Sequence, residues 1–160
     1  MTPLPQEFPR ELALLRLDDV LGDLPDEAAR RAYVAAFEAR RADPLAPGGL
    51  VIVGAEPAAL RLVMALMRLT VLRFRDLNFE RFEAVGGKER LLTAYVRGEN
   101  LALPLPDRAG ALFIERADRA EAGLAGALAG WERPLFATWE GPAGGPVWEA
   151  LTRRCAVLKV

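Results

Sequence analysis

The stretch "ALFIERADR", Ala111–Arg119, opens with four apolar residues and continues with acidic and basic residues in alternation. A short uninterrupted apolar run is typical of a strand that is covered on both faces, as the strands of parallel sheets are. The charged continuation indicates that this strand leaves the core at a polar edge of the sheet. The stretch therefore predicts a buried strand with Glu115 and Arg116 at its carboxyl end.

Four further segments have the composition of strands. Leu50–Gly54 ("LVIVG") is another short apolar run, and it ends in a glycine. The other three are Thr70–Arg75 ("TVLRFR"), Pro134–Trp139 ("PLFATW") and Cys155–Val160 ("CAVLKV"). Together with Ala111–Glu115 they make five expected strands.

Helix-sized segments precede and separate these strands. The longest, Leu24–Pro44, has acids near its start and arginines near its end, which suits the helix dipole, and we expect Pro25 in its first turn. The others span residues 10–21, 57–69, 88–98, 117–130 and 147–154. Strict alternation of strands and helices implies right-handed crossovers. The sequence therefore predicts a three-layer α/β fold, a five-stranded parallel sheet with helices on both faces.

The chain is organised as one domain with a short lead-in. Three prolines among the first nine residues favour an extended start, so residues 1–24 are expected to form a lead-in and a short helix. Residues 25–160 contain no internal repeat and no boundary that invites a division. We expect them to fold as a single α/β domain.

Composition excludes several classes of function. The chain has 21 basic and 22 acidic residues, a net charge of −1, which gives no electrostatic argument for coating nucleic acid or a membrane surface. It has no histidine and one cysteine, Cys155, so a cysteine-rich zinc site and a cysteine–histidine catalytic pair are both ruled out. No apolar stretch approaches the ~20 residues of a membrane span. A cytoplasmic protein without a secretory signal is expected.

The turn after the first strand lacks the groups of a phosphate-binding loop. Such a loop follows the pattern G-x-x-x-x-G-K-[ST], in which backbone N–H groups wrap the phosphates, a lysine reaches the terminal phosphate and a hydroxyl binds magnesium. Counted from Gly54, with Pro57 in the turn, the last three positions are Ala59, Leu60 and Arg61. The lysine and the hydroxyl are both missing, so no nucleotide cofactor is expected.

The opening strand is the second place where catalytic groups would stand. Nucleotide-hydrolysing enzymes end such a strand with two acids, one for the metal and one for the attacking water. Glu115 occupies the first of these places, and Arg116 occupies the second. Arginine stays protonated and cannot accept a proton from water. The sequence therefore predicts no catalytic residue and no metal site.

Four segments together resemble the AAA+ ATPases, in particular clamp-loader-type subunits, which belong to the P-loop NTPases. The resemblance covers residues 25–160. "LVIVGAEPAALRLVMAL" looks like the strand, loop and helix around the nucleotide, and "LFIERADR" is similar to the family's "LFIDEADR". "PLFATW" matches the strand that presents a polar sensor residue, here Thr138 or Glu140. "ALTRRCAVLKV" looks like the segment that carries an arginine finger, here Arg154.

The resemblance implies an inactive member of that family. The lysine, the hydroxyl and the catalytic glutamate are replaced, and the helical lid that follows the last core strand in the family is not found in these residues. Family members whose nucleotide sites lack these groups act as structural subunits beside active partners. We therefore expect a scaffold or regulatory subunit of a DNA replication, repair or transcription assembly. Its partner would be an active ATPase of the same fold or a second copy, and its contact residues Glu115, Arg116, Thr138, Arg153 and Arg154.

Two other functions stay open, beside ordinary structural explanations for each motif. The chain could bind nucleotide through an atypical loop in which Arg61 replaces the lysine. It could instead bind nucleic acid through the aromatic and basic residues between Phe74 and Arg81. The ordinary explanations are a plain strand-to-helix turn at Gly54, a salt-bridged strand end at Glu115 and Arg116, and a helix-end position for Arg153 and Arg154.

Overall fold

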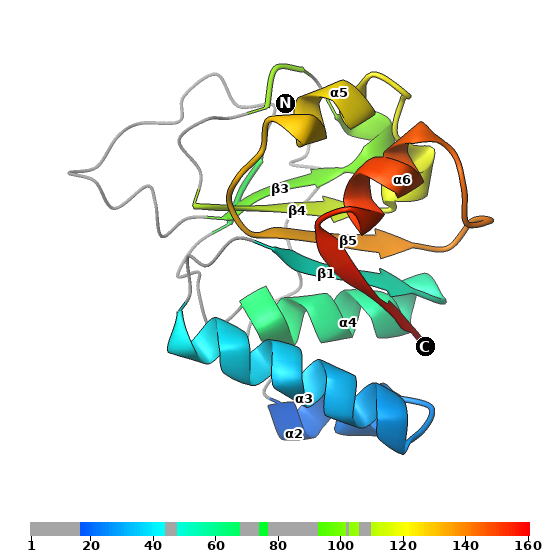
Figure 1. The fold of residues 1–160 in the computed structure, drawn as a ribbon. Helices are drawn as coiled ribbons and strands as arrows, with labels where there is room; N and C mark the ends of the chain where they lie inside the picture. Colours follow the sequence, from blue (N-terminus) through cyan, green and yellow to red (C-terminus); the bar gives the residue numbers. More distant parts are fainter. Residues whose placement is uncertain (1–16, 44–47, 68–73, 77–92, 102, 106–109) are drawn as a thin grey trace, which may run out of the picture.

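The computed structural model describes residues 17–43, 48–67, 74–76, 93–101, 103–105 and 110–160 (Figure 1). These residues include six strands, which form one sheet in the order β2-β3-β4-β5-β1-β6, and every neighbouring pair is parallel. The strands are β1 (Gly49–Val53), β2 (Phe74–Asp76), β3 (Thr93–Arg97), β4 (Ala111–Glu115), β5 (Leu135–Trp139) and β6 (Cys155–Lys159).

Helices cover both faces of the sheet (Figure 1). On one face lie α2 (Leu17–Val20), the 3-10 turn η1 (Leu21–Asp23), α3 (Glu27–Ala42) and α4 (Glu56–Met67). On the other face lie α5 (Leu124–Ala129) and α6 (Pro146–Thr152). The 3-10 turns η3 (Gly98–Asn100) and η4 (Ala117–Arg119) follow β3 and β4 directly. The α/β class, with a parallel sheet between two helical layers, is thus confirmed.

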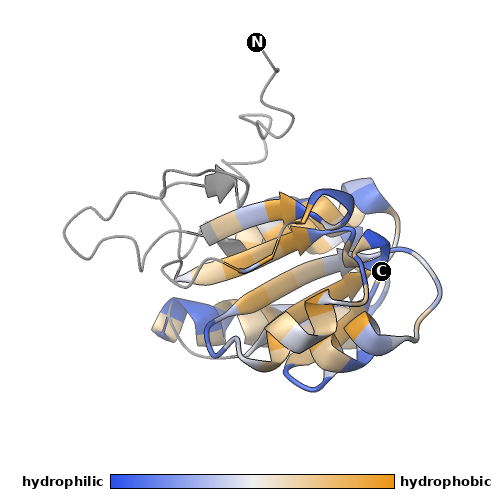
Figure 2. Ribbon diagram, turned by 90° about the horizontal axis from the view of Figure 1, so that it is seen from above, coloured by the Kyte–Doolittle hydropathy of each residue, from blue (hydrophilic) through white to orange (hydrophobic). Residues whose placement is uncertain are grey.

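Two apolar cores explain why the strands read as continuous apolar runs. Leu50, Ile52 and Phe113 belong to the core beneath α3 and α4, whereas Val51 and Leu112 belong to the core beneath α5 and α6. Alternate side chains of a strand point to opposite faces, so a strand covered on both faces needs an apolar residue at every position. Figure 2 shows that the strands are mainly hydrophobic, whereas the helices mix hydrophobic and hydrophilic residues.

The sheet has one strand more than the sequence predicted. The helix expected over 88–98 is wrong for its described part, because Thr93–Arg97 forms β3 between β2 and β4. Its "TAYVR" sequence is rich in β-branched and aromatic residues, which fit a pleated, buried surface. Leucines and charges just upstream suggested helical spacing, and short apolar runs do not distinguish the two structures. Of the expected strand Thr70–Arg75, the described part is Phe74 and Arg75, which belong to β2.

Helix boundaries differ from the predictions at two places. The side chain of Asp26 caps α3 by accepting a hydrogen bond of 2.8 Å from the Ala29 amide, so Pro25 precedes the helix instead of lying in its first turn. The single helix expected over 117–130 is divided into η4 and the shorter α5. The other described segments, including β1, β4, β5, α6 and β6, match their predicted positions closely.

Two smaller expectations concern the membrane and the cysteine. Among the helices of the described ranges, none combines the length and the apolar character that crossing a membrane requires. Cys155 is buried at the start of β6, and burial raises the pKa of its thiol to about 12. It is therefore a protonated core residue at neutral pH.

Candidate functional site at the carboxyl edge of the sheet

The parallel sheet brings the ends of β3, β4, β5 and β1 to one edge. Arg97 pairs in register with Glu115, and Val53 pairs with Trp139. After β1 the chain enters α4 on one face, whereas after β5 it enters α6 on the other face (Figure 1). Ligands of open α/β sheets bind in the crevice at such a switch point, outside the carboxyl ends of the strands. This edge is therefore the first place to look for function.

The turn after β1 is too short to be a phosphate loop. β1 ends at Val53 and α4 begins at Glu56, so Gly54 and Ala55 make up the whole turn. Pro57, Ala59, Leu60 and Arg61 all lie within α4. The expectation that Pro57 lies in the turn is therefore wrong. A helical segment cannot wrap its backbone N–H groups around phosphates, because most of these groups are bonded within the helix.

Gly54 is a packing requirement of this turn. Its amide donates a hydrogen bond of 2.9 Å to the Trp139 carbonyl, so it is not available to a phosphate. A Cβ at this position would lie 2.6 Å from Cγ2 of Val160 and 2.8 Å from its carbonyl oxygen. The glycine therefore allows the end of the chain to pack beside β1, where the Val160 amide donates to the Val53 carbonyl at 2.8 Å.

Arg61 does not replace the missing lysine. Its Nε donates to Oδ2 of Asp23 at 2.9 Å, and its Nη2 donates to the carbonyl of Asp19 at 3.0 Å. These bonds hold α4 against α2 and η1, on the outer layer of helices. The Arg61 side chain is thus engaged with η1 and α2 and not with the turn after β1.

A network around Arg116 links the ends of β1, β4 and β5. The Arg116 guanidinium binds Asp118 through two hydrogen bonds, Nε to Oδ1 at 3.0 Å and Nη2 to Oδ2 at 2.8 Å. Its Nη1 lies 3.1 Å from the Glu140 carboxylate and 3.8 Å from that of Glu56. These four residues, Arg116, Asp118, Glu140 and Glu56, are called the Arg116 cluster below. Hydrogen bonding to Asp118 and the neighbouring carboxylates raise the pKa of Arg116 above its usual value.

Backbone geometry helps to position this cluster. Arg116 adopts a left-handed conformation with φ of 57°, which is uncommon for a residue other than glycine. Its amide donates a hydrogen bond of 2.8 Å to Oγ1 of Thr138, so the hydroxyl of the expected sensor residue holds the turn. The amides of Glu140 and Gly141 both donate to Asp118. The turns after β4 and β5 are therefore tied together.

Glu115 lies in a second, more buried group. The Tyr95 hydroxyl donates a hydrogen bond to Oε2 of Glu115, and Nη1 of Arg97 lies 3.7 Å from the same oxygen. Arg97 also pairs with Glu99 at 2.7 Å and with Glu56 at 3.3 Å, so Glu56 joins this group to the Arg116 cluster. Burial and the nearby Glu56 raise the pKa of Glu115, and together they outweigh the opposing effect of Tyr95 and Arg97.

Burial limits what these residues can contact. Glu115 is 4% exposed and Thr138 is 1% exposed, so neither can meet a partner directly, and the expectation of contacts through them must be corrected. They hold the edge together from within. Glu140 and Arg119 are the charged residues of this region with the more exposed side chains, at 43% and 46%. Within the described ranges, no group of histidine, cysteine and carboxylate side chains could hold a metal ion.

Arg153 and Arg154 lie at the other edge of the sheet. They precede β6, whose first residue, Cys155, pairs with Gly49 at the amino end of β1. Nη1 of Arg154 donates to the carbonyl of Leu128 at 3.0 Å and so satisfies a carbonyl near the end of α5. The structure therefore separates these arginines from Glu115, Arg116 and Thr138, which the sequence had placed in one contact surface.

Several members of the site were not expected from the sequence. Tyr95 and Arg97 were missed because they lie in the segment taken for a helix. Asp118 was quoted within a motif but given no role, although its spacing from Arg116 allows the bidentate contact. Glu56 had one usable signal, an acid at the first position of a helix that follows a strand. The proposed surface between Phe74 and Arg81 lies outside the residues whose side chains the structure describes.

The raised pKa of Glu115 predicts a pH dependence of stability. A carboxyl whose pKa is higher in the folded state favours folding at low pH, and this contribution is lost as pH rises through the folded pKa. We expect the free energy of unfolding to fall as pH rises above ~4.3, the ordinary glutamate pKa. Glu115→Gln should remove that part of the slope in urea unfolding between pH 4 and pH 8. An unchanged slope in the variant would contradict this assignment.

Neither a comparison with models of protein families nor a comparison with curated proteins gives a match for this chain.

Proposed function

We propose that this chain is a non-catalytic AAA+-like domain that works by protein–protein contact, as a scaffold or regulatory subunit. The observation that supports it best is the Arg116 cluster. An internal ion-pair network occupies the switch point of the sheet, where a ligand of an open α/β fold would bind. The AAA+ relationship and the partner class rest on the resemblance of the four sequence segments.

The charges at this edge oppose a nucleotide. Glu56 is the first residue of α4, so its negative charge lies at the helix N-terminus that would otherwise attract a phosphate. Arg116 is already paired with Asp118 and lies near two further carboxylates. A phosphate would have to displace these acids and would then face them at close range, which is unfavourable for like charges.

The same arrangement opposes hydrolysis. The position of a water-activating acid holds Arg116, which cannot accept a proton. Glu115 is buried and accepts a hydrogen bond from Tyr95, and the carboxylates of Asp118, Glu140 and Glu56 lie in ion pairs with Arg116. These side chains support the proposal that the domain is non-catalytic.

The contact with a partner is proposed to involve the outer rim of this edge. Glu140 and Arg119 have side chains that are 43% and 46% exposed, and both are oriented by internal ion pairs, to Arg116 and to Glu99. Fixed, exposed charges of both signs give a rim that can select a partner by charge complementarity. An active ATPase of the same fold is the partner class that the resemblance favours, with a second copy as the alternative.

We expect calorimetric titration with ATP and magnesium to show no binding at micromolar concentrations and no turnover. The reason is that the ion pairs of the Arg116 cluster lie at the switch point and that the turn after β1 has only two residues. A partner contact is tested separately, by placing a photo-crosslinker at Glu140 and, as the matched control, at exposed Arg153 on the opposite edge. Crosslinking to an ATPase or to a second copy is expected at position 140 only. Micromolar nucleotide binding, or equal crosslinking at both positions, would overturn the proposal.

A further inference from the structure

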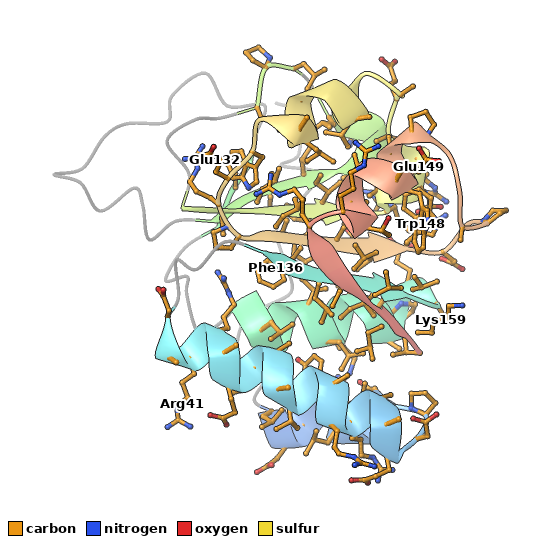
Figure 3. The ribbon with its side chains drawn as sticks, in the orientation of Figure 1. Arg41, Glu132, Phe136, Trp148, Glu149 and Lys159 are labelled. Carbon is orange, nitrogen blue, oxygen red and sulfur yellow. The ribbon has the colours of Figure 1, made fainter. Side chains whose placement is uncertain are left out.

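Arg40, near the end of α3, is a buried charged residue on the face of the sheet that lies beneath α3 and α4. Its relative exposure is 6%, and its guanidinium lies 4.5 Å above the ring centroid of Phe136, a residue of β5. Within the described part of the chain, Nε and Nη2 of Arg40 have no hydrogen-bond partner. Figure 3 shows Phe136 in the layer between the sheet and these helices. Arg41, which follows Arg40 in the chain, points away from the sheet.

A buried guanidinium with two unpaired nitrogens is unfavourable. Removing a charge from water costs free energy that only hydrogen bonds or an opposite charge can offset. Burial lowers the pKa of Arg40 to about 10, and the nearby Asp43 opposes this effect only in part. A leucine or methionine would fill the same space without this cost. An unsatisfied buried group of this kind calls for a ligand or another specific explanation.

A cavity of about 120 Å³ lies directly beside this side chain, and Arg40 forms part of its wall. Ala36 and Ala39 of α3, Leu50 of β1 and Phe136 of β5 supply apolar walls. For comparison, an apolar cavity of ~150 Å³ is large enough to bind benzene. The cavity is therefore sized for a small organic molecule.

We propose that this cavity binds a small monocarboxylate, whose two oxygens pair with the Nε–Nη2 edge of Arg40 while its short apolar tail lies against Ala36, Leu50 and Phe136. Nε and Nη2 are the nitrogens on one side of the guanidinium, and such a pair matches the two oxygens of a carboxylate in a bidentate contact. Both nitrogens are buried in the structure. Binding therefore includes a turn of the guanidinium towards the cavity, over the ring of Phe136.

The chemistry of the walls favours a carboxylate over a phosphate. Asp43 lies at the cavity and places a carboxyl group near any anion that enters. A dianion would meet this acid and only one arginine, whereas a monoanion needs one positive partner. The apolar walls also add affinity for a hydrocarbon tail, which inorganic phosphate lacks. A chain of roughly two to four carbons fits a space slightly smaller than the benzene-binding one.

The experiment is an NMR titration of the full chain with sodium butyrate, and with sodium phosphate and sodium chloride at matched ionic strength. Butyrate should shift the amide signals of Gly48, Gly49 and Leu50, which line the cavity, in a saturable way. It should also raise the thermal unfolding midpoint by several degrees at saturation, because a ligand that binds only the folded state stabilises it. This site lies at the amino edge of the sheet, so the result does not depend on the proposed function.

Two variants and a matched control identify the group responsible. Arg40→Lys keeps the positive charge but loses the two adjacent donors Nε and Nη2. It should weaken butyrate binding at least tenfold. Arg40→Met should abolish the saturable shifts while folding normally, because no hydrogen bond from Nε or Nη2 of Arg40 to a described residue is lost. Arg41→Met alters an exposed arginine of the same helix and should bind as the wild type does.

The proposal is overturned by any of three outcomes. Butyrate could give no saturable shift at Gly48 to Leu50 in the wild-type protein, a result that requires no variant. Phosphate could shift the same amides with equal affinity, which would refute the carboxylate assignment. Arg40→Met could retain wild-type butyrate affinity, which would remove Arg40 from the site.

Discussion

Replacing Arg116 with alanine is expected to lower the free energy of unfolding by about 2 kcal/mol at pH 7, since removing one partner of a partly buried ion pair leaves the other uncompensated. The side chain of Asp118 is only 8% exposed, and two of its hydrogen bonds come from Arg116. The variant would leave this carboxylate with the amides of Glu140 and Gly141. Glu140 and Glu56 are more exposed, so their loss of a partner adds little.

The effect of Arg116→Ala should depend on pH in a defined direction. Burial by itself would raise the pKa of Asp118, but hydrogen bonds from Arg116 and from the Glu140 amide outweigh burial and lower it. A carboxyl whose pKa is lower in the folded state stabilises the fold above its unfolded pKa, and this contribution is lost as pH falls through the folded value. The difference between wild type and variant should therefore be largest at neutral pH and should shrink below ~4, the ordinary aspartate pKa.

Two control variants separate the ion pairs from other effects. Arg119→Ala removes an exposed arginine whose ion pair with Glu99 is 3.6 Å long, so we expect a change of at most about 0.5 kcal/mol. Arg116→Gly removes the guanidinium but relieves the left-handed backbone, so it should be about 1 kcal/mol more stable than Arg116→Ala. Urea unfolding at pH 7 and pH 3.5 measures all of them. If Arg116→Ala lowered the free energy of unfolding no more than Arg119→Ala does, the Arg116 cluster would not stabilise this edge as we describe.

The sequence predicted the layers of this fold better than the number of its strands. Uninterrupted apolar runs identified β1, β4 and β5, because helices cover each of these strands on both faces. The run of β6 identified it too, although β6 is an edge strand in which Ala156 and Val157 are exposed. β3 was missed because the leucines and charges that precede it imitate a helix. The strand order was out of reach, since it depends on contacts between residues far apart in the chain. β1, for example, lies between β5 and β6 in the sheet, although β2, β3 and β4 lie between β1 and β5 in the sequence.

The candidate site was predicted in part, and for a physical reason. Glu115, Arg116 and Thr138 follow or end parallel strands, so they had to share one edge, and the structure brings them together. Their roles were not predictable, because the pairing of Arg116 with Glu56 depends on the strand order. Arg154 was assigned to the same edge through the family resemblance. Its position before a parallel strand indicates the amino edge instead, and this signal was already present in the sequence.

Replacing Gly98 with alanine is expected to lower the free energy of unfolding by about 3 kcal/mol, a cost typical of severe overpacking. Gly98 begins η3 and is buried against the turn after β4. A Cβ at this position would lie 2.1 Å from the carbonyl oxygen of Arg116 and 3.1 Å from the amide nitrogen of Ala120. Both neighbours are backbone atoms, so no side chain can rotate away to make room.

The Arg116 backbone is also held in place, so the strain cannot be relieved there. Its amide donates to Thr138, and its carbonyl accepts a hydrogen bond of 2.9 Å from the Arg119 amide. Alanine at position 98 should therefore push β3 away from β4 at the carboxyl edge and weaken the contact of Tyr95 with Glu115. Faster amide hydrogen exchange in Tyr95, Val96 and Ile114 would report this separation, beside the lower urea midpoint.

Gly126→Ala is the matched control, because it makes the same change where there is space. Gly126 lies inside α5, and no atom of the described residues outside its neighbours and its own helix backbone lies within 4 Å of its expected Cβ. Alanine there should stabilise the protein by about 0.5–1 kcal/mol, because it has the higher helix propensity and restricts the unfolded chain. A Gly98→Ala protein that is as stable as Gly126→Ala would show that the turns after β3 and β4 are not packed as closely as this site requires. The opposite signs expected for the two variants make the comparison independent of any general effect of replacing glycine.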